Sequence, residues 1–205
     1  MKNNPILIYH YDVVKDVLGF GKRLVIWFNG CPFRCTGCIE EKLQSGDLGR
    51  YVTTIDLLNE LDDILPNVDG LTFSGGEPLW QSVSLLEFLD LIPRDLDKML
   101  FTGYDVSELN TNKLKCYERF DLVISGRFQQ NKMGNYLWRG SSNQKYFSPS
   151  GKYNSIIKDL NSTESVGLDI KVKSKELFYY GIPTSNNEIK IINSAFNMNG
   201  IRTKG

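Results

Sequence analysis

The chain contains 205 residues, of which 24 are Lys or Arg and 24 are Asp or Glu, and 41% of its residues are hydrophobic. This length and composition favour one globular domain over residues 1–205 and exclude a disordered chain, since a domain averages roughly 150 residues. The zero net charge argues against a nucleic-acid partner, and the lack of an apolar run of roughly 20 residues argues against a membrane partner.

The first half of the chain alternates β-branched or aromatic runs with amphipathic helical patterns. Its N-terminus lacks the apolar core and the cleavage site of a secretory signal, so we expect a cytoplasmic protein. Arg23–Phe28 is rich in β-branched and aromatic residues and predicts a buried strand. Thr53 and Thr54 supply an N-cap for a helix that we expect to reach about Leu65.

The same alternation continues to residue 124. The elements predicted there are a strand at 71–74, a helix at 82–92, a strand at 99–101, one or two weaker helices within 105–119, and a strand at 122–124. Strands that alternate with helices are typical of a parallel sheet with helical crossovers. The predicted fold class is therefore α/β, with a mostly parallel sheet.

The chain is less regular from about residue 126 onward, and we treat this part as a C-terminal extension of the domain. Between Gly126 and Gly151 the sequence shows no periodic pattern, and we expect no regular element there. Two strands are predicted at 166–172 and 177–180, around a Lys-Ser-Lys turn. The last segment fits either a helix or irregular structure.

Three of the four cysteines lie within eight residues, at Cys31, Cys35 and Cys38. This clustering indicates a metal site, because a disulfide framework spreads its cysteines along the chain. A structural zinc site needs four protein ligands, and the fourth would have to be Cys116 or His10. A [4Fe–4S] cluster held by three thiolates leaves one iron open, as catalysis requires. We favour the [4Fe–4S] cluster and keep zinc completed by Cys116 as the alternative.

Three motifs each follow a predicted strand. They are the cysteine loop, the Gly75–Pro78 turn of sequence Gly-Gly-Glu-Pro, and the pair Thr102-Gly103. In parallel sheets with helical crossovers, ligands bind at the carboxyl ends of the strands. We therefore expect all three motifs to meet at one edge of the sheet and to form one site.

The cysteine loop followed by Gly-Gly-Glu-Pro resembles the radical S-adenosylmethionine (SAM) superfamily, and further motifs resemble one branch of it, the activating proteins of anaerobic ribonucleotide reductase. The resemblance implies a curved sheet that forms a partial radical SAM barrel. The motifs of the branch that stand in this chain are Gly19-Phe-Gly21-Lys-Arg23, Gly37 before the third cysteine, Gly126-Arg127-Phe128, Trp138-Arg-Gly-Ser-Ser-Asn-Gln144 and Tyr180-Gly-Ile-Pro183.

The chain departs from the pattern of this branch at three places. Glu77 replaces the usual Asp of the branch, although Glu is the commoner residue in the superfamily. Ser125 replaces an Asp before Gly-Arg-Phe. The residues after Cys38, which begin Ile39-Glu40, lack the usual aromatic residue and Asn. These departures bear on which substrate the protein uses.

The resemblance also implies a set of site residues. Cys31, Cys35 and Cys38 would hold the [4Fe–4S] cluster, and the amine and carboxylate of SAM would chelate its fourth iron. The residues implied to lie beside the adenine of SAM are Gly37, Cys38 and Ile39. Those implied at its methionyl group are Gly75, Gly76, Glu77 and Pro78, with Glu77 facing the ammonium. Thr102 is implied to lie at the ribose or methionyl side. The roles of Arg127 and Arg139 stay open between the SAM carboxylate, a partner's acidic surface and no ligand.

The function implied by the resemblance is that of an activase. One electron passed through the cluster would cleave SAM, and the 5′-deoxyadenosyl radical would take a Cα hydrogen from a glycine of a partner glycyl-radical enzyme, here an anaerobic ribonucleotide reductase. The electron donor would be a flavodoxin or a similar low-potential protein. Two alternatives remain, namely a radical SAM enzyme that modifies another peptide or a small metabolite, and a non-enzymatic zinc or iron–sulfur module.

Overall fold

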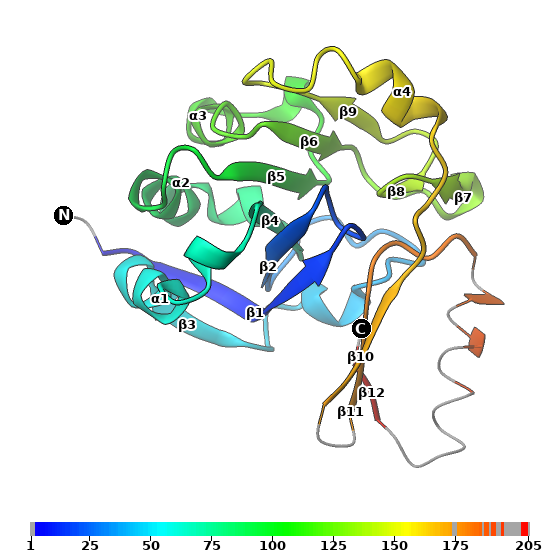
Figure 1. Cartoon of the computed structure of the whole chain (residues 1–205), viewed down its shortest axis with the longest axis horizontal. Coiled ribbons are helices and arrows are strands. Elements are labelled where there is room, and N and C mark those ends of the chain that lie inside the picture. The colour runs from blue at the N-terminus through cyan, green and yellow to red at the C-terminus, as the bar shows by residue number, and fades with distance from the viewer. Residues whose placement is uncertain are drawn as a thin grey trace.

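A seven-stranded mixed sheet forms the centre of the computed structural model (Figure 1), which describes residues 3–173, 176–185, 187–188, 190–191, 194 and 202–204. The sheet has the order β3-β1-β2-β4-β5-β6-β9. Its strands are β1 (Pro5–Lys15), β2 (Lys22–Phe28), β3 (Arg50–Thr53), β4 (Gly70–Gly75), β5 (Asp97–Thr102), β6 (Leu122–Ser125) and β9 (Lys145–Phe147). Among the described residues, β3 and β9 are open edges, so the sheet does not close into a barrel.

The four central strands β2, β4, β5 and β6 are parallel to one another. The connections between them contain α1 (Thr54–Leu61), α2 (Ser82–Leu91) and α3 (Thr111–Tyr117), and these three helices lie on one face of the sheet (Figure 1). The outer strands β1 and β9 run antiparallel to their neighbours. The predicted α/β class with a mostly parallel sheet and helical crossovers is confirmed.

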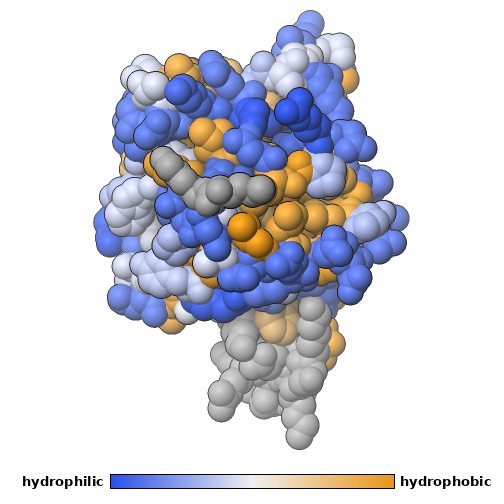
Figure 2. All heavy atoms as spheres, turned by 90° about the vertical axis from the view of Figure 1, so that its left-hand side faces the viewer, coloured by the Kyte–Doolittle hydropathy of each residue, from blue (hydrophilic) through white to orange (hydrophobic). Residues whose placement is uncertain are grey.

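The two faces of the sheet pack against different layers. Leu24, Ile26 and Phe28 on β2 belong to the core cluster shared with the helices. The alternate residues Val25 and Trp27 belong to a second cluster, on the face away from the helices. Figure 2 views the helical side, where apolar residues gather in the middle and hydrophilic residues surround them. No helix in the described part of the chain has the length and apolar character needed to cross a bilayer.

The predicted elements before residue 125 agree with the structure, with differences at their ends. Thr53 caps α1, since its side chain accepts a hydrogen bond from the amide of Asp56. The helix ends at Leu61 and not near Leu65, because the next residues turn before a short 3-10 helix begins at Leu65. The weak helical signal at 105–119 corresponds to a 3-10 helix at Val106–Glu108 and to α3.

The expectation of no regular element between residues 126 and 151 was wrong. This stretch contains β7 (Met133–Tyr136) and β8 (Arg139–Ser141), which form an antiparallel hairpin, and the edge strand β9. Strands of three or four residues are too short to show a periodic pattern, and pairing with neighbours that are distant in sequence stabilises them. A further helix, α4 (Ile157–Ser162), was not predicted.

The two strands predicted near the C-terminus are confirmed as an antiparallel pair, β10 (Asp169–Lys173) and β11 (Glu176–Tyr180). Of the predicted Lys-Ser-Lys turn, Lys173 ends β10, and residues 174 and 175 lie outside the described residues. A third strand, β12 (Arg202–Lys204), pairs with β11 in parallel. Tyr180 attaches this small sheet to the main one, since its hydroxyl donates a hydrogen bond of 2.7 Å to Asp12 and its ring lies 5.1 Å from that of Trp27.

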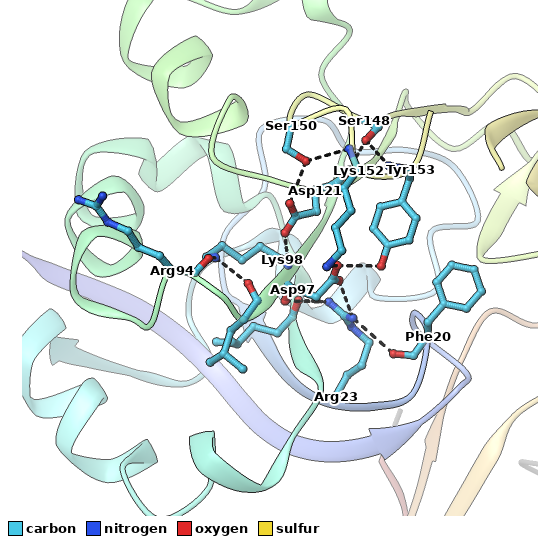
Figure 3. A network of polar contacts seen from close by, with 12 residues as sticks. Phe20, Arg23, Arg94, Asp97, Lys98, Asp121, Ser148, Ser150, Lys152 and Tyr153 are labelled. Atoms are coloured by element: carbon cyan, nitrogen blue, oxygen red, sulfur yellow. Dashed lines mark hydrogen bonds and ion pairs between the residues drawn. The ribbon is translucent and has the colours of Figure 1, made fainter. Parts of the chain in front are cut away.

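A buried ion pair connects the amino ends of the parallel strands (Figure 3). The guanidinium of Arg23 on β2 donates to Asp97 of β5 at 2.8 Å and to Thr72 of β4 at 2.7 Å. Arg23 is 1% exposed. A side chain at Gly19 would lie 2.5 Å from Cδ of Arg23. The Gly-x-Gly-x-Arg motif therefore has a structural role, at the edge of the sheet opposite the predicted site.

Candidate functional site

The cysteine loop starts directly after β2 and is fixed at both ends by backbone hydrogen bonds. The amide of Gly30 donates to the carbonyl of Leu43 at 2.7 Å, and the amide of Cys31 donates to the carbonyl of Gln44 at 3.2 Å. Arg34 adds a side-chain bond of 2.7 Å to the carbonyl of Cys31. These contacts hold a short loop on which all three thiols, those of Cys31, Cys35 and Cys38, are half-buried.

The three predicted motifs line one cavity of about 160 Å³ at the carboxyl ends of β2, β4, β5 and β6. The prediction that these motifs meet at one edge of the sheet is confirmed. The lining residues from the motifs are Cys31, Cys35, Gly37, Cys38, Ile39, Gly75, Gly76, Glu77, Thr102 and Gly103. Pro78, by contrast, is buried at the start of a 3-10 helix and is not part of the cavity wall, so its expected contact with SAM stays a prediction.

The donor set of this cavity fits an iron–sulfur cluster. Three thiols come from one loop, and in the described part of the chain no three His, Cys, Asp or Glu side chains converge on a point where they could hold a single metal ion. In a cubane each thiolate binds a different iron, so its ligands need not converge on one point. Burial raises the pKa of Cys31 to about 11 and also raises the pKa of Cys38, and the positive charge of bound iron would favour their ionised forms.

The two residues considered as a fourth zinc ligand lie elsewhere. Cys116 on α3 is 0% exposed and packs within the helical core cluster. His10 on β1 stacks against Trp27, with the ring centroids 5.8 Å apart. Neither residue lines the cavity of the three cysteines. This arrangement disfavours a zinc site completed by Cys116 or His10.

The Gly75–Pro78 turn packs tightly against the base of the cysteine loop. The amide of Gly76 donates to the carbonyl of Phe28 at 2.8 Å, and the amide of Glu77 donates to the carbonyl of Gly30 at 2.9 Å. A Cβ atom on Gly76 would lie 2.3 Å from that same carbonyl oxygen of Gly30. Gly75 adopts a φ of +97°, which side chains disfavour. Glycine is therefore required at both positions for the turn to approach the loop.

Glu77 uses its carboxylate to join the turn to the end of β5. One oxygen accepts hydrogen bonds from the amide of Leu79 at 2.9 Å and from the hydroxyl of Thr102 at 2.8 Å, and the other accepts from the amide of Gly103 at 2.7 Å. Burial raises the pKa of Glu77 to about 7, against the opposing effect of these three bonds. The carboxylate is thus already held by the protein, although Glu77 also lines the cavity.

The predicted adenine side of the cavity has one neighbour that the sequence did not indicate. Gly37 has a φ of +72°, and a Cβ atom there would lie 2.8 Å from the side-chain amide carbon of Gln130. Gln130 belongs to a 3-10 helix, Gln130–Lys132, in the stretch where no regular element was expected. The glycine before Cys38 therefore makes room for a protein side chain.

The structure distinguishes the two arginines whose roles were open. Arg127 lies over the ring of Phe33, which is part of the cysteine loop, at 4.3 Å from the ring centroid, and it forms an ion pair of 2.7 Å with Glu108. Both Arg127 and Phe33 line the cavity. Arg139 is 6% exposed, donates to the carbonyl of Gln144 at 3.0 Å and is not part of the cavity wall. Arg127 therefore belongs to the site, and Arg139 stabilises the fold.

Several wall residues were not predicted from the sequence. Sequence reasoning missed Phe33, Glu40, Ser74, Phe101, Phe128, Met133, Trp138, Gln144, Ile182 and Pro183. Five of these residues fall within quoted family motifs, which was the available signal for them: Phe128, Trp138, Gln144, Ile182 and Pro183. Burial also raises the pKa of Glu40 to about 7, because its carboxyl group is enclosed by the loop and the cavity wall.

Comparison with known proteins places the chain among iron–sulfur proteins. The family described as "4Fe-4S single cluster domain" matches residues 17–147. The anaerobic ribonucleoside-triphosphate reductase-activating protein of Haemophilus influenzae is 33% identical, over 69% of this chain and 95% of its own length. The protein of the same name from Escherichia coli K12 is 31% identical, over 66% of this chain and 95% of its own length. The one from phage T4 is 30% identical, over 69% of this chain and 91% of its own length. The structure of QueE from Escherichia coli aligns with 97% of this chain and 92% of its own chain, at 13% identity and a TM-score of 0.44.

Proposed function

Because the chain belongs to the family of anaerobic ribonucleoside-triphosphate reductase-activating proteins, we propose that it is a radical SAM activase of an anaerobic ribonucleotide reductase. The observation that carries this proposal is the meeting of the cysteine loop, the glycine turn and Thr102 around one cavity. The cluster, when bound, supplies the electron that cleaves SAM to methionine and a 5′-deoxyadenosyl radical, which takes a Cα hydrogen from a glycine of the reductase.

We assign the cluster to Cys31, Cys35 and Cys38, the three thiols that line the cavity. The backbone of Gly75 and Gly76 lets the methionyl group of SAM approach the sheet closely, because neither residue has a Cβ atom. Gly37, Cys38 and Ile39 border the nucleoside. The protein's task in this chemistry is to position SAM and to exclude water, because the cofactors carry out the bond breaking.

We propose a second role for Glu77 beside the one expected for it. Its three hydrogen bonds from the protein hold the glycine turn against the end of β5, and the residue also lines the cavity together with Gly75 and Gly76. We therefore assign Glu77 to both tasks, positioning the turn and attracting the ammonium of SAM. Thr102 acts through Glu77.

The proposal is tested by electron paramagnetic resonance. The protein is reconstituted with iron and sulfide without oxygen, reduced, and incubated with SAM and an anaerobic ribonucleotide reductase. A glycyl-radical doublet on the reductase is expected with the wild-type protein and not with Cys35→Ala. The first reaction uses dithionite as the reductant. In a second reaction, a reduced protein of the flavodoxin class replaces it, since we propose such a protein as the electron donor.

A second candidate is a radical SAM enzyme that acts on another peptide or on a small metabolite. The wall residue Glu40 favours it, because it stands in the segment after Cys38 where the chain departs from the activase pattern. Formation of 5′-deoxyadenosine from SAM, without any radical on the reductase, would support this second function and reject the activase.

A further inference from the structure

Glu40 places a carboxyl group in the wall between two adjoining cavities. It lies two residues after Cys38 and lines both the main cavity and a smaller one of about 40 Å³. Ile39, Ser74 and Ile182 also line both cavities. Glu40 therefore stands where the cysteine loop, the end of β4 and the segment after β11 come together.

One oxygen of this carboxyl group has no partner among the described residues. Oε2 of Glu40 is buried, and no described donor lies within hydrogen-bonding distance of it. Buried carboxylate oxygens are nearly always hydrogen-bonded, because an unpaired one has lost its hydrogen bonds to water and no bond from the protein offsets that cost in free energy. An unpaired acceptor in the wall of a ligand cavity is therefore a place for a donor on the ligand.

The other acidic residue of the main cavity does not offer such an open position. Among the described residues, Glu40 and Glu77 are the acidic members of the cavity wall. Both oxygens of Glu77 already accept hydrogen bonds from the protein, from Leu79, Thr102 and Gly103. Glu40 is thus the acidic residue of this wall that has an open acceptor.

We propose that Oε2 of Glu40 accepts a hydrogen bond from the nucleoside half of SAM, either from a ribose hydroxyl or from the exocyclic amine of the adenine. This inference rests on the proposed function. It follows from chain position, since Glu40 directly continues the segment Gly37–Ile39 that borders the nucleoside, whereas the methionyl half is assigned to the turn at Gly75 and Gly76.

The test is equilibrium binding measured by calorimetry on anaerobic, cluster-loaded protein, so it does not depend on turnover. The ligands are SAM, 5′-methylthioadenosine, which lacks the amino-acid half, and methionine, which lacks the nucleoside. The variants are Glu40→Gln and, as the matched control, Glu41→Gln, because Glu41 is the exposed neighbour. Iron content and circular dichroism are recorded for each protein.

We expect Glu40→Gln to weaken SAM and 5′-methylthioadenosine by about tenfold, which corresponds to ~1.4 kcal/mol, and to leave methionine unchanged. Glu41→Gln should bind all three ligands as the wild type does. Equal binding of 5′-methylthioadenosine by wild type and Glu40→Gln would overturn the inference while leaving the activase proposal intact. Loss of methionine binding alone would also overturn it. Failure of the loaded wild type to bind SAM would reject both.

A series on the unmodified protein covers the case in which Glu40→Gln does not take up its cluster. 5′-Methylthioadenosine is compared with its 2′-deoxy, 3′-deoxy and inosine analogues, each of which lacks one candidate donor. We expect one of the three to bind about tenfold more weakly, and its identity names the donor. Unchanged affinity for all three would overturn the inference.

Discussion

The hydroxyl of Thr102 donates a hydrogen bond of 2.8 Å to Oε1 of Glu77, and this bond joins the end of β5 to the glycine turn that follows β4. Both residues are almost completely buried, with Glu77 1% and Thr102 5% exposed. The backbone amide of Glu77, within this turn, donates a hydrogen bond to the carbonyl of Gly30 at the base of the cysteine loop. The glycine turn and the pair Thr102-Gly103 are thus joined by hydrogen bonds to the side chain of Glu77, which was expected only to bind the cofactor.

Removing the hydroxyl of Thr102 should destabilise the protein measurably. Thr102→Val keeps the shape of the side chain but leaves the buried carboxylate of Glu77 with one donor fewer. We expect the free energy of unfolding, measured by urea denaturation, to fall by about 1–3 kcal/mol. Thr111→Val is the control, because Thr111 is exposed on α3 and should change stability little. Equal effects in both variants would contradict the assigned role of the bond.

The assignment of the cluster ligands predicts opposite behaviour for two cysteines. Cys35→Ala should lose bound iron and activity together, because two thiolates cannot replace three in holding the cluster. Cys116→Ala should keep both, because that thiol is buried in the helical core away from the cavity. The measurement is iron and sulfide per chain after anaerobic reconstitution, with the visible absorption of the cluster. Equal iron loss in both variants would show that the ligands are misassigned.

Arg127 should stabilise the cysteine loop from its place in the cavity wall. Its guanidinium lies over the ring of Phe33, between Cys31 and Cys35, so Arg127→Met removes a contact that holds the loop against the sheet. A cation–π contact of this kind contributes about 0.5–1 kcal/mol. We expect iron to be released to a chelator about two to five times faster.

The control for Arg127 is Arg119→Met. Arg119 forms a comparable exposed ion pair, with Asp90, but it lies on the helical side away from the cavity. Its substitution should leave the rate of iron release unchanged. If both variants release iron at the wild-type rate, the stacking of Arg127 on Phe33 does not hold the loop.

The buried pair of Arg23 and Asp97 predicts how stability depends on pH. Burial raises the pKa of Asp97, but the charge of Arg23 and the hydrogen bonds from Lys152, Tyr153 and Arg23 outweigh it and hold that pKa below its ordinary value of 3.8. The stabilisation is therefore fully present above the unfolded-state pKa and is lost as pH falls through the lowered one. The free energy of unfolding of the wild type should decline more steeply below about pH 4 than that of Asp97→Asn.

At neutral pH, Asp97→Asn should cost about 3–5 kcal/mol, because it leaves the buried Arg23 without a counter-charge. Arg50→Met is the matched control, because its ion pair with Glu60 is exposed and contributes at most about 1 kcal/mol. Both values come from urea denaturation at pH 7. Identical slopes below pH 4 in the wild type and Asp97→Asn would show that Asp97 is not the group that titrates.

Residue spacing alone predicted most of the parallel sheet and the edge at which the site forms. The runs at 23–28 and 71–74 are buried on both faces of the sheet, and strands of this kind are rich in apolar residues. Their composition alone therefore predicted them as strands. By contrast, β7, β8 and β9 are short and partly exposed to solvent, and no local sequence pattern predicted them. Their stability comes from pairing with distant segments, which the sequence does not display.

By itself, the sequence determined the chemistry of the donors: three thiols on one loop, two glycines in a turn and the order of strands that brings them together, because these depend on residue type and spacing. The tertiary structure decided which side chains share the cavity and which are already paired. It placed Cys116 and Arg139 in the core, held Glu77 by three protein bonds and left Oε2 of Glu40 without a described partner. Burial and hydrogen bonding are properties of contacts between distant segments, and only the folded chain makes those contacts.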